Sequence, residues 1–237
     1  MVVKLKGLIN GMLKEQKKKT DMEFEILQAQ INPHFLYNTL DSIRWLAVIQ
    51  NVENISEMSS ALINLLKYNI SKKGTIVSLK EEIDGIKNYE TIQKYRYGDT
   101  FCIEYNIQEE TLDCKIIKFI LQPLVENAIF HGINVSDSDA KIKITSEIQN
   151  NDLVIKVIDN GVGMNVLNRD DNSIKKKKMH TGIGLNNIEE RIKLYFGEKY
   201  GIEIFSKIDV GTTVKITLPL VRTAEEIKDK IKIDYDV

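Results

Sequence analysis

The sequence predicts an α+β protein in which a helical hairpin, paired with a second copy into a four-helix bundle, precedes an α/β sandwich. Two observations predict this fold class. Between residues 27 and 66, apolar residues recur every three or four positions, which is the period of a buried helix face. Beyond residue 100, strand-like stretches are interspersed with helices. This order favours helices grouped on one face of a mostly antiparallel sheet.

Composition limits the classes of function. A chain of 237 residues can form one large or two small domains, and its net charge of −1 excludes a general attraction to nucleic acid or membrane. Cys102 and Cys114 lack metal-ligand spacing, which favours a reducing compartment. No apolar run approaches the ~20 residues of a membrane span. We therefore expect a soluble, cytoplasmic piece, and its start within a helical pattern predicts excision from a longer protein.

The N-terminal third predicts two helices. The first runs through residues 4–47 with a kink at Pro33, since proline lacks a backbone donor and clashes one turn back. The second begins near Glu53 and stops at 72–74, where basic residues and glycine suit a helix C-terminus. A polar loop, 50–54, joins them. Because such a hairpin buries little alone, we predict a homodimer.

The rest of the chain predicts the sandwich. Ser78 and Glu81 form a capping box that opens a helix to about Tyr97, and residues 101–107 alternate as a strand does. Residues 113–130 are strongly apolar and predict a helix lying against the sheet. The remaining predicted elements are strands at 141–147, 153–158, 202–208 and 212–218, with a helix at 185–196. The predicted segments are a linker (1–19), the hairpin (20–76), the sandwich (77–222) and a charged tail (223–237).

His34 directly follows Pro33, and Asn38 lies one turn further on the same helix face. A lone histidine is more often structural than functional, so the position alone decides nothing.

Asn127 and Asp159 are candidate ligand-binding residues of the second domain. Asn127, within the segment Q-P-L-V-E-N-A-I-F-H-G, offers a carboxamide oxygen that suits Mg²⁺, although a helix-end asparagine can also be a cap. Asp159 opens D-N-G-V-G-M at the end of an apolar strand. Its carboxylate can accept a hydrogen bond from an exocyclic amine such as that of adenine, and Gly161 and Gly163 permit close backbone approach. A plain hairpin turn is the alternative.

A glycine-rich turn, T-G-I-G-L-N-N-I at 181–188, precedes a predicted helix and contains Gly182 and Gly184. Free backbone N–H groups at a helix N-terminus bind anions, although such turns are frequent without any ligand.

The order and spacing of these three segments resembles the N, G1 and G2 boxes of the gyrase–Hsp90–histidine kinase–MutL ATPase superfamily. The segment Gly211-Thr212-Thr213, leading to Leu218-Pro219, resembles its closing strand, and Q-I-N-P-H-F-L-Y-N resembles the phosphoacceptor helix of LytS/YesM-type sensor histidine kinases. The resemblance implies a Bergerat-type ATP-binding fold, ATP and Mg²⁺ as cofactors, and His34 as phosphoacceptor. It also implies a response-regulator receiver domain as partner, and a sensor region ahead of residue 1 in the bacterial cell membrane.

The resemblance also implies roles for single residues. Asp159 would bind the adenine amine and Asn127 would hold Mg²⁺, while Gly182 and Gly184 would flank a lid over 164–181. Further implied nucleotide contacts are Gly161, Gly163, Leu185 and Thr213, with His131, His180 and Lys178 as candidates for which plain structural roles stay open.

Departures from the family pattern qualify the expected chemistry. Pro123 stands where gyrase-like ATPases place a glutamate that activates water, which disfavours ATP hydrolysis. Phe35 replaces a common acidic base, so the base for His34 is unidentified and Asp41 is the remaining candidate. Phe130 stands where relatives often carry Lys or Arg, and Asn38 can orient either the imidazole or a hydrolytic water. Two alternatives remain, a gyrase- or Hsp90-like ATP-hydrolysing machine and a degenerate kinase acting as a dimeric scaffold.

Overall fold

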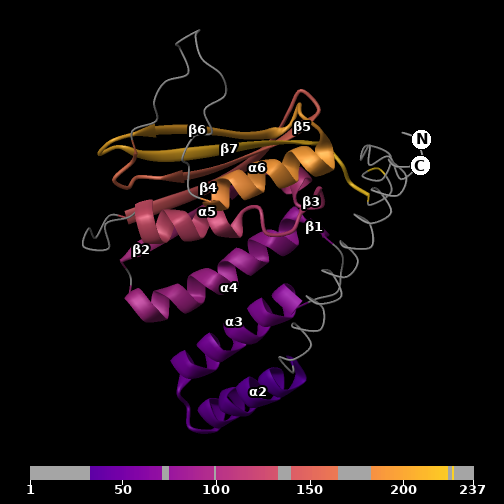
Figure 1. The fold of residues 1–237 in the computed structure, drawn as a ribbon. Coiled ribbons are helices and arrows are strands. Elements are labelled where there is room, and N and C mark those ends of the chain that lie inside the picture. Colours follow the sequence, from indigo (N-terminus) through magenta and orange to yellow (C-terminus); the bar gives the residue numbers. More distant parts are fainter. Residues whose placement is uncertain are drawn as a thin grey trace, which may run out of the picture. The chain divides into compact units, whose positions relative to one another are not determined.

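The chain forms two compact units, residues 1–63 and 64–237 (Figure 1). The computed structural model describes residues 33–70, 75–98, 100–132, 140–164, 183–223 and 226. Among these, no helix combines the length and apolar character that crossing a bilayer requires. The division falls inside a helix, ahead of the boundary at residues 76 and 77 that the sequence predicts.

The first unit contains a helical hairpin, as predicted. Helix α2 (Pro33–Ile49) is followed by α3 (Glu53–Ile70), whose last turns belong to the second unit. The turn between them is tight, because Asn51 adopts a left-handed φ of 57° and the Val52 N–H donates to the Ala47 carbonyl at 2.8 Å. The predicted kink at Pro33 involves the residues before it, and the predicted basic stop lies at 72–74; both segments are outside the described part of the chain.

Helix α2 leaves most of its apolar side chains exposed. Its one buried residue is Ala47, whereas Trp45 and Ile49 are 54% and 72% exposed. The exposed apolar residues of α2 are Phe35, Ile43, Trp45, Leu46, Val48 and Ile49. Single exposed apolar residues are ordinary, but this density on one helix marks an interaction surface.

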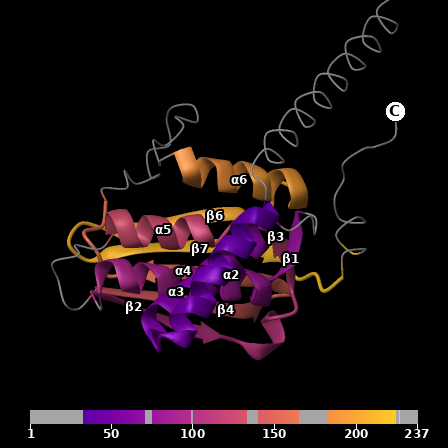
Figure 2. The same ribbon diagram turned by 90° about the horizontal axis from the view of Figure 1, so that it is seen from below.

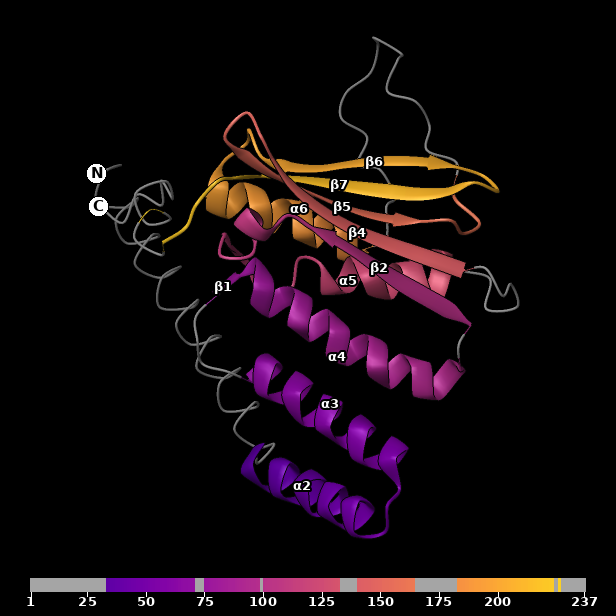
Figure 3. The ribbon, with the colours of Figure 1, turned by 180° about the vertical axis from the view of Figure 1, so that it is seen from behind.

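The second unit is built on a mixed five-stranded sheet, which confirms the predicted α+β class (Figure 3). Its strand order is β2 (Phe101–Ile107), β4 (Ala140–Gln149), β5 (Asp152–Asp159), β7 (Gly211–Pro219) and β6 (Gly201–Lys207). Only the β2–β4 pair is parallel. A second small sheet pairs β1 (Ile76–Ser78) with β3 (Lys115–Ile117), antiparallel.

Three helices cover one face of the large sheet: α4 (Leu79–Tyr97), α5 (Gln122–Asn127) and α6 (Ile183–Phe196). Helix α5 contacts both others and lies between them (Figures 1 and 2). Every second residue of the inner strands points into this core, as strand geometry requires. The fully buried residues of β4, β5 and β7 are Ile142, Ile144, Leu153, Ile155, Ile216 and Leu218.

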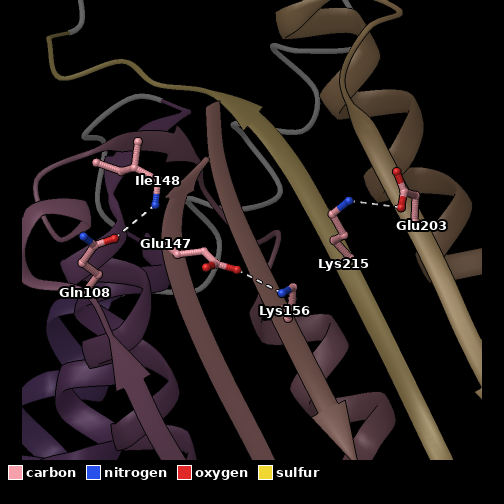
Figure 4. Close-up of polar contacts among 6 residues, drawn as sticks. All are labelled: Gln108, Glu147, Ile148, Lys156, Glu203 and Lys215. Atoms are coloured by element: carbon pink, nitrogen blue, oxygen red, sulfur yellow. Dashed lines mark hydrogen bonds and ion pairs between the residues drawn. The ribbon is translucent and has the colours of Figure 1, made fainter. Parts of the chain in front are cut away.

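The opposite face of the sheet is mostly polar. Cross-strand ion pairs join Lys156 to Glu147 at 3.0 Å and Lys215 to Glu203 at 3.2 Å (Figure 4). The Gln108 side chain accepts a hydrogen bond from the Ile148 N–H at 3.1 Å beside them. The sheet therefore has one face for the core and one for solvent, as antiparallel sheets commonly do.

Helix α4 begins with the predicted capping box. The Ser78 hydroxyl accepts from the Glu81 N–H at 3.2 Å, and the Glu81 carboxylate accepts from the Ser78 N–H at 2.9 Å. The helix ends at Gly98, whose φ of 71° is a left-handed conformation that glycine adopts readily.

The continuous helix predicted over residues 113–130 is wrong. Strand β3 occupies its start, where Ile116 pairs with Val77, and the next turn gives Phe119 a φ of 61° that no helix contains. Helix α5 begins only at Gln122, with Pro123 in its first turn, where proline is favoured. Short apolar runs fit a buried strand and a buried helix equally, which explains the error.

Candidate active site

Asp159 ends strand β5 with a buried carboxylate. Its Oδ1 accepts hydrogen bonds from the N–H groups of Gly161 at 3.0 Å and Thr212 at 3.2 Å. Burial raises the pKa of Asp159, and the two backbone N–H groups oppose that rise. Both bonds from described residues go to Oδ1, so Oδ2 is the oxygen that can accept from a ligand amine.

Gly163, the second glycine after Asp159, packs against protein backbone. Gly163 has a φ of 63°, and a Cβ there would lie 2.0 Å from the Lys207 carbonyl oxygen. The segment is held further by the Asp209 N–H, which donates to the Val162 carbonyl at 2.9 Å. Gly163 was predicted to allow close approach of a ligand, but the close approach in the structure is to the β6–β7 hairpin. The turn after Asp159 is therefore fixed in place.

Asn127 is the last residue of α5 and is half-buried. It is followed directly by a π-helical turn, Ala128–Gly132, a form often found at functional sites. Within the described part of the chain, the Asn127 carboxamide makes no hydrogen bond, so its oxygen can ligate a hard cation. The described residues contain no cluster of three or more His, Cys, Asp or Glu that could hold a metal alone. A cation here would need further ligands, such as phosphate oxygens.

Helix α6 contains Gly184 and Leu185 and belongs to the second unit, as do Asn127 and Asp159. Gly184 lies in the first turn, and no heavy atom of the described residues comes within 4 Å of where its Cβ would be. This open space suits a helix N-terminus that faces a ligand. Leu185 packs against the core. Gly182, Lys178 and His180 lie outside the described residues, and of His131 only the backbone, in the π-helical turn, is described.

Thr212, which the sequence reasoning missed, lies closer to Asp159 than Thr213 does. Thr212 is paired with Asp159 across β7 and β5 and donates its N–H to the carboxylate. Thr213 is paired with Ile158, so its side chain points to the opposite face of the sheet. The alternation of Val214, Ile216 and Leu218 was the available signal, because Thr212 shares their face.

His34 lies in the first turn of α2, in the other unit, and its side chain is exposed. The Asn38 side-chain nitrogen lies 3.2 Å from His34 Nδ1, as the spacing of one turn predicts. Asp41, the candidate base, instead forms an ion pair with Arg44 at 2.8 Å. The structure thus brings Asn38 to His34 and leaves the base unassigned.

Comparison with known proteins explains these arrangements. Residues 22–101 match the histidine kinase family model, and residues 113–222 match the model for histidine kinase-, DNA gyrase B- and HSP90-like ATPases. The sensor histidine kinase YesM of Bacillus subtilis is 41% identical over 215 residues, which cover 89% of this chain and 36% of that protein. This chain belongs to the sensor histidine kinase family.

A second member of the sensor histidine kinase family, the sensor protein kinase HptS of Staphylococcus aureus, is 31% identical over 218 residues. The match covers 91% of this chain and 42% of HptS. The chain therefore spans less than half the length of these relatives. A solved histidine kinase domain from Erythrobacter litoralis aligns over 85% of this chain and 98% of its own, with 13% identity and a TM-score of 0.48.

The two matched regions divide the site residues. The first contains His34 and Asn38, and the second contains Asn127, Asp159 and Gly184. The chain thus consists of an α-helical region that matches the histidine kinase model, followed by a domain that matches the ATPase model.

Proposed function

We propose that this chain binds ATP with Mg²⁺ in its second unit and transfers the γ-phosphoryl group to His34. The observation that carries the proposal is the Asp159 carboxylate, which is buried and fixed through Oδ1 while Oδ2 stays available. A carboxylate in this setting selects a ligand that donates, as the adenine amine does. The family of the chain supports the same assignment.

Nucleotide binding would use residues from three elements. Asp159 and Thr212 would contact the base, Asn127 would ligate Mg²⁺, and the first turn of α6 at Gly184 would face the phosphates. Thr212 replaces Thr213 in this proposal because of its strand face. When bound, Mg²⁺ supplies charge neutralisation at the transferring phosphoryl group.

At the acceptor, Asn38 would set the tautomer of the His34 ring. With its nitrogen toward Nδ1, Asn38 donates and the ring proton lies on Nε2. Turning the carboxamide over presents its oxygen, holds the proton on Nδ1 and leaves the Nε2 lone pair free for attack. The bond from Nε2 to phosphorus then forms as the bond to the bridging oxygen breaks, and the electron pair leaves with ADP.

Transfer to histidine is favoured over ATP hydrolysis by Pro123. This residue stands where gyrase-like enzymes carry a glutamate, and in this chain it lies in the first turn of helix α5. A proline offers no base for a water molecule. The gyrase-like alternative is therefore disfavoured, and the available Asn127 and Asp159 groups argue against a nucleotide-free scaffold.

The partners follow from the same proposal. The exposed apolar residues of α2 would be covered by a second copy, giving a homodimeric helical bundle through residues 20–76. Phosphohistidine would supply the aspartate of a response-regulator receiver domain. The relatives are named as sensor proteins and are more than twice as long, so a membrane sensor region would precede this cytoplasmic piece in the full protein.

The proposal is tested by incubating the protein with γ-labelled ATP and Mg²⁺, beside the His34→Gln variant. We expect label on the wild type alone, stable to base and lost in acid, as a phosphoramidate is. Label on both proteins would move the acceptor away from His34. Steady release of phosphate without labelled protein would favour the hydrolysing alternative.

A further inference from the structure

Glu82 is a buried carboxylate at the centre of the second unit, with 1% of its surface exposed. It lies in the first turn of α4, yet its backbone partners come from the loop before α5 and from the first residue of α5. Its Oε1 accepts from the N–H groups of Leu121 at 3.0 Å and Gln122 at 3.4 Å, and its Oε2 accepts from the Phe119 N–H at 3.0 Å. A side chain of α4 thus caps the N-terminus of α5, where backbone N–H groups lack partners within the helix.

The last turns of α3 are tied to the same carboxylate. The Tyr68 hydroxyl donates to Glu82 Oε2, and burial beside this carboxylate raises the pKa of Tyr68. The buried Lys118 ammonium donates to the carbonyls of Tyr68 and Asn69 at the end of α3, where a positive charge suits the helix dipole. Desolvation lowers the pKa of Lys118, and the nearby Glu82 charge opposes that shift.

Helix α6 joins the same loop from the other side. Arg191 donates to the carbonyls of Lys118 at 2.6 Å and Phe119 at 3.3 Å. Phe119 itself holds a left-handed φ of 61°, which a non-glycine residue adopts only when its surroundings impose it. The loop 118–122 is therefore fixed by Glu82 through its N–H groups and by Arg191 through its carbonyls.

This loop leads directly into α5, which is only six residues long and ends at Asn127. So short a helix has little stability of its own, and its position depends on what holds its first turn. We propose that Glu82 is a positioning residue of the nucleotide site, which places the Asn127 carboxamide for Mg²⁺ by fixing the start of α5 and linking it to the end of α3. The inference rests on the proposed function, since it assumes that Asn127 is a Mg²⁺ ligand.

Glu90 provides a matched control on the same helix. It is also buried, and it also accepts from a tyrosine hydroxyl, that of Tyr105 at 2.7 Å. Tyr105 lies on β2, however, and Glu90 has no hydrogen bond to the loop before α5 among the described residues. Glu90→Gln therefore removes a buried charge, and Tyr105→Phe a hydroxyl, without removing a hydrogen bond to the loop before α5.

The test measures binding of the non-hydrolysable β,γ-imido analogue of ATP by calorimetry, with Mg²⁺ and with EDTA. The ratio of the two Kd values gives the Mg²⁺-dependent gain in affinity. We expect Glu82→Gln to lower this gain about tenfold, as loss of a residue supporting a metal ligand does, while the Kd in EDTA stays within about threefold. Tyr68→Phe, which keeps the carboxylate, should lower the gain about threefold, and both control variants should leave it unchanged.

An unchanged gain in Glu82→Gln, or an equal loss of affinity with and without Mg²⁺, would overturn the inference, because a purely structural residue affects both conditions alike. Should Glu82→Gln fail to fold, the Tyr68→Phe variant provides the test. If its Mg²⁺-dependent gain in affinity equals that of the wild type, the inference is overturned. A wild type that binds no nucleotide at all would instead refute the proposed function, and one that binds without a Mg²⁺ gain would refute the role of Asn127 and this inference together.

Discussion

The two units of this chain differ in how completely they bury their apolar side chains. Helix α2 buries only Ala47 and exposes six large apolar residues, whereas most of the apolar residues of the second unit are buried in a core between one sheet face and three helices. The polar groups of the second unit are also largely satisfied, down to a buried carboxylate with four donors. From this difference we expect that the unit with the proposed nucleotide site can stand alone, while the unit with His34 needs a partner.

Gly163→Ala is the most direct way to break the second unit. A Cβ at this position would meet the Lys207 carbonyl at 2.0 Å and would also be strained at a φ of 63°. We expect the free energy of unfolding to fall by about 3 kcal/mol or more, measured by urea denaturation. The control is Gly184→Ala, whose Cβ meets open space. Equal stability of the two variants would contradict the packing described for the turn after Asp159.

Asp159→Asn separates binding from stability within that unit. Oδ1 must remain an acceptor for two N–H groups, so the amide nitrogen would take the place of Oδ2. The amide nitrogen and the adenine amine are both donors, so the hydrogen bond between them would be lost. We expect nucleotide affinity to fall about 100-fold, or ~2.7 kcal/mol. Calorimetry with ADP measures this loss, and an affinity within threefold of the wild type would remove Asp159 from the site.

Leu46→Glu with Ile49→Glu tests whether the first unit needs a partner. Both side chains are exposed in the chain and would be buried between two copies, where unpaired carboxylates are costly. We expect the Kd of dimerisation to rise by about tenfold or more, measured by analytical ultracentrifugation. Gln50→Glu, in the exposed turn, adds charge without removing an apolar group and should leave the dimer intact. A wild type that is monomeric at all concentrations would contradict the expectation that the first unit needs a partner.

The smallest expected effect concerns the pH dependence of stability. Burial raises the pKa of Asp159 in the folded state above its ordinary value of 3.8, so the folded protein holds this proton more tightly than the unfolded chain does. The wild type therefore loses stability as pH rises from 3.8 through the folded pKa, and Asp159→Asn does not. At pH 7.5 the variant should be the more stable of the two proteins, and well below pH 3.8 the difference should vanish. A difference independent of pH would contradict the direction of the pKa shift.

Local chemistry made part of the fold predictable. The capping box of Ser78 and Glu81 needs only four consecutive residues, and the structure shows both of its hydrogen bonds. The alternation of residues 101–107 and the turn between α2 and α3 are local in the same sense. These predictions are confirmed because each depends on residues that are neighbours in the sequence.

Contacts distant in sequence account for what the sequence did not show. Whether Ile116 lies in a helix or a strand depends on its pairing with Val77, 39 residues earlier. The role of Glu82 depends on N–H groups about 40 residues later and on the hydroxyl of Tyr68. Hydrophobic periodicity in the sequence does not predict such long-range contacts. The choice of Thr212 over Thr213 was accessible, in contrast, from the alternation of the strand that follows.

The central claim is that the γ-phosphoryl group of ATP bound in the second unit is transferred to a ring nitrogen of His34 in the first unit. Phosphorus NMR of the protein after reaction with ATP and Mg²⁺ tests it most directly, because the two phosphohistidine isomers and phosphoaspartate have distinct resonances. We predict a single phosphohistidine signal, from the Nε2 isomer, that is absent in His34→Gln while that variant still binds ADP with wild-type affinity. A signal that persists in His34→Gln, or one from another type of residue, would contradict the account.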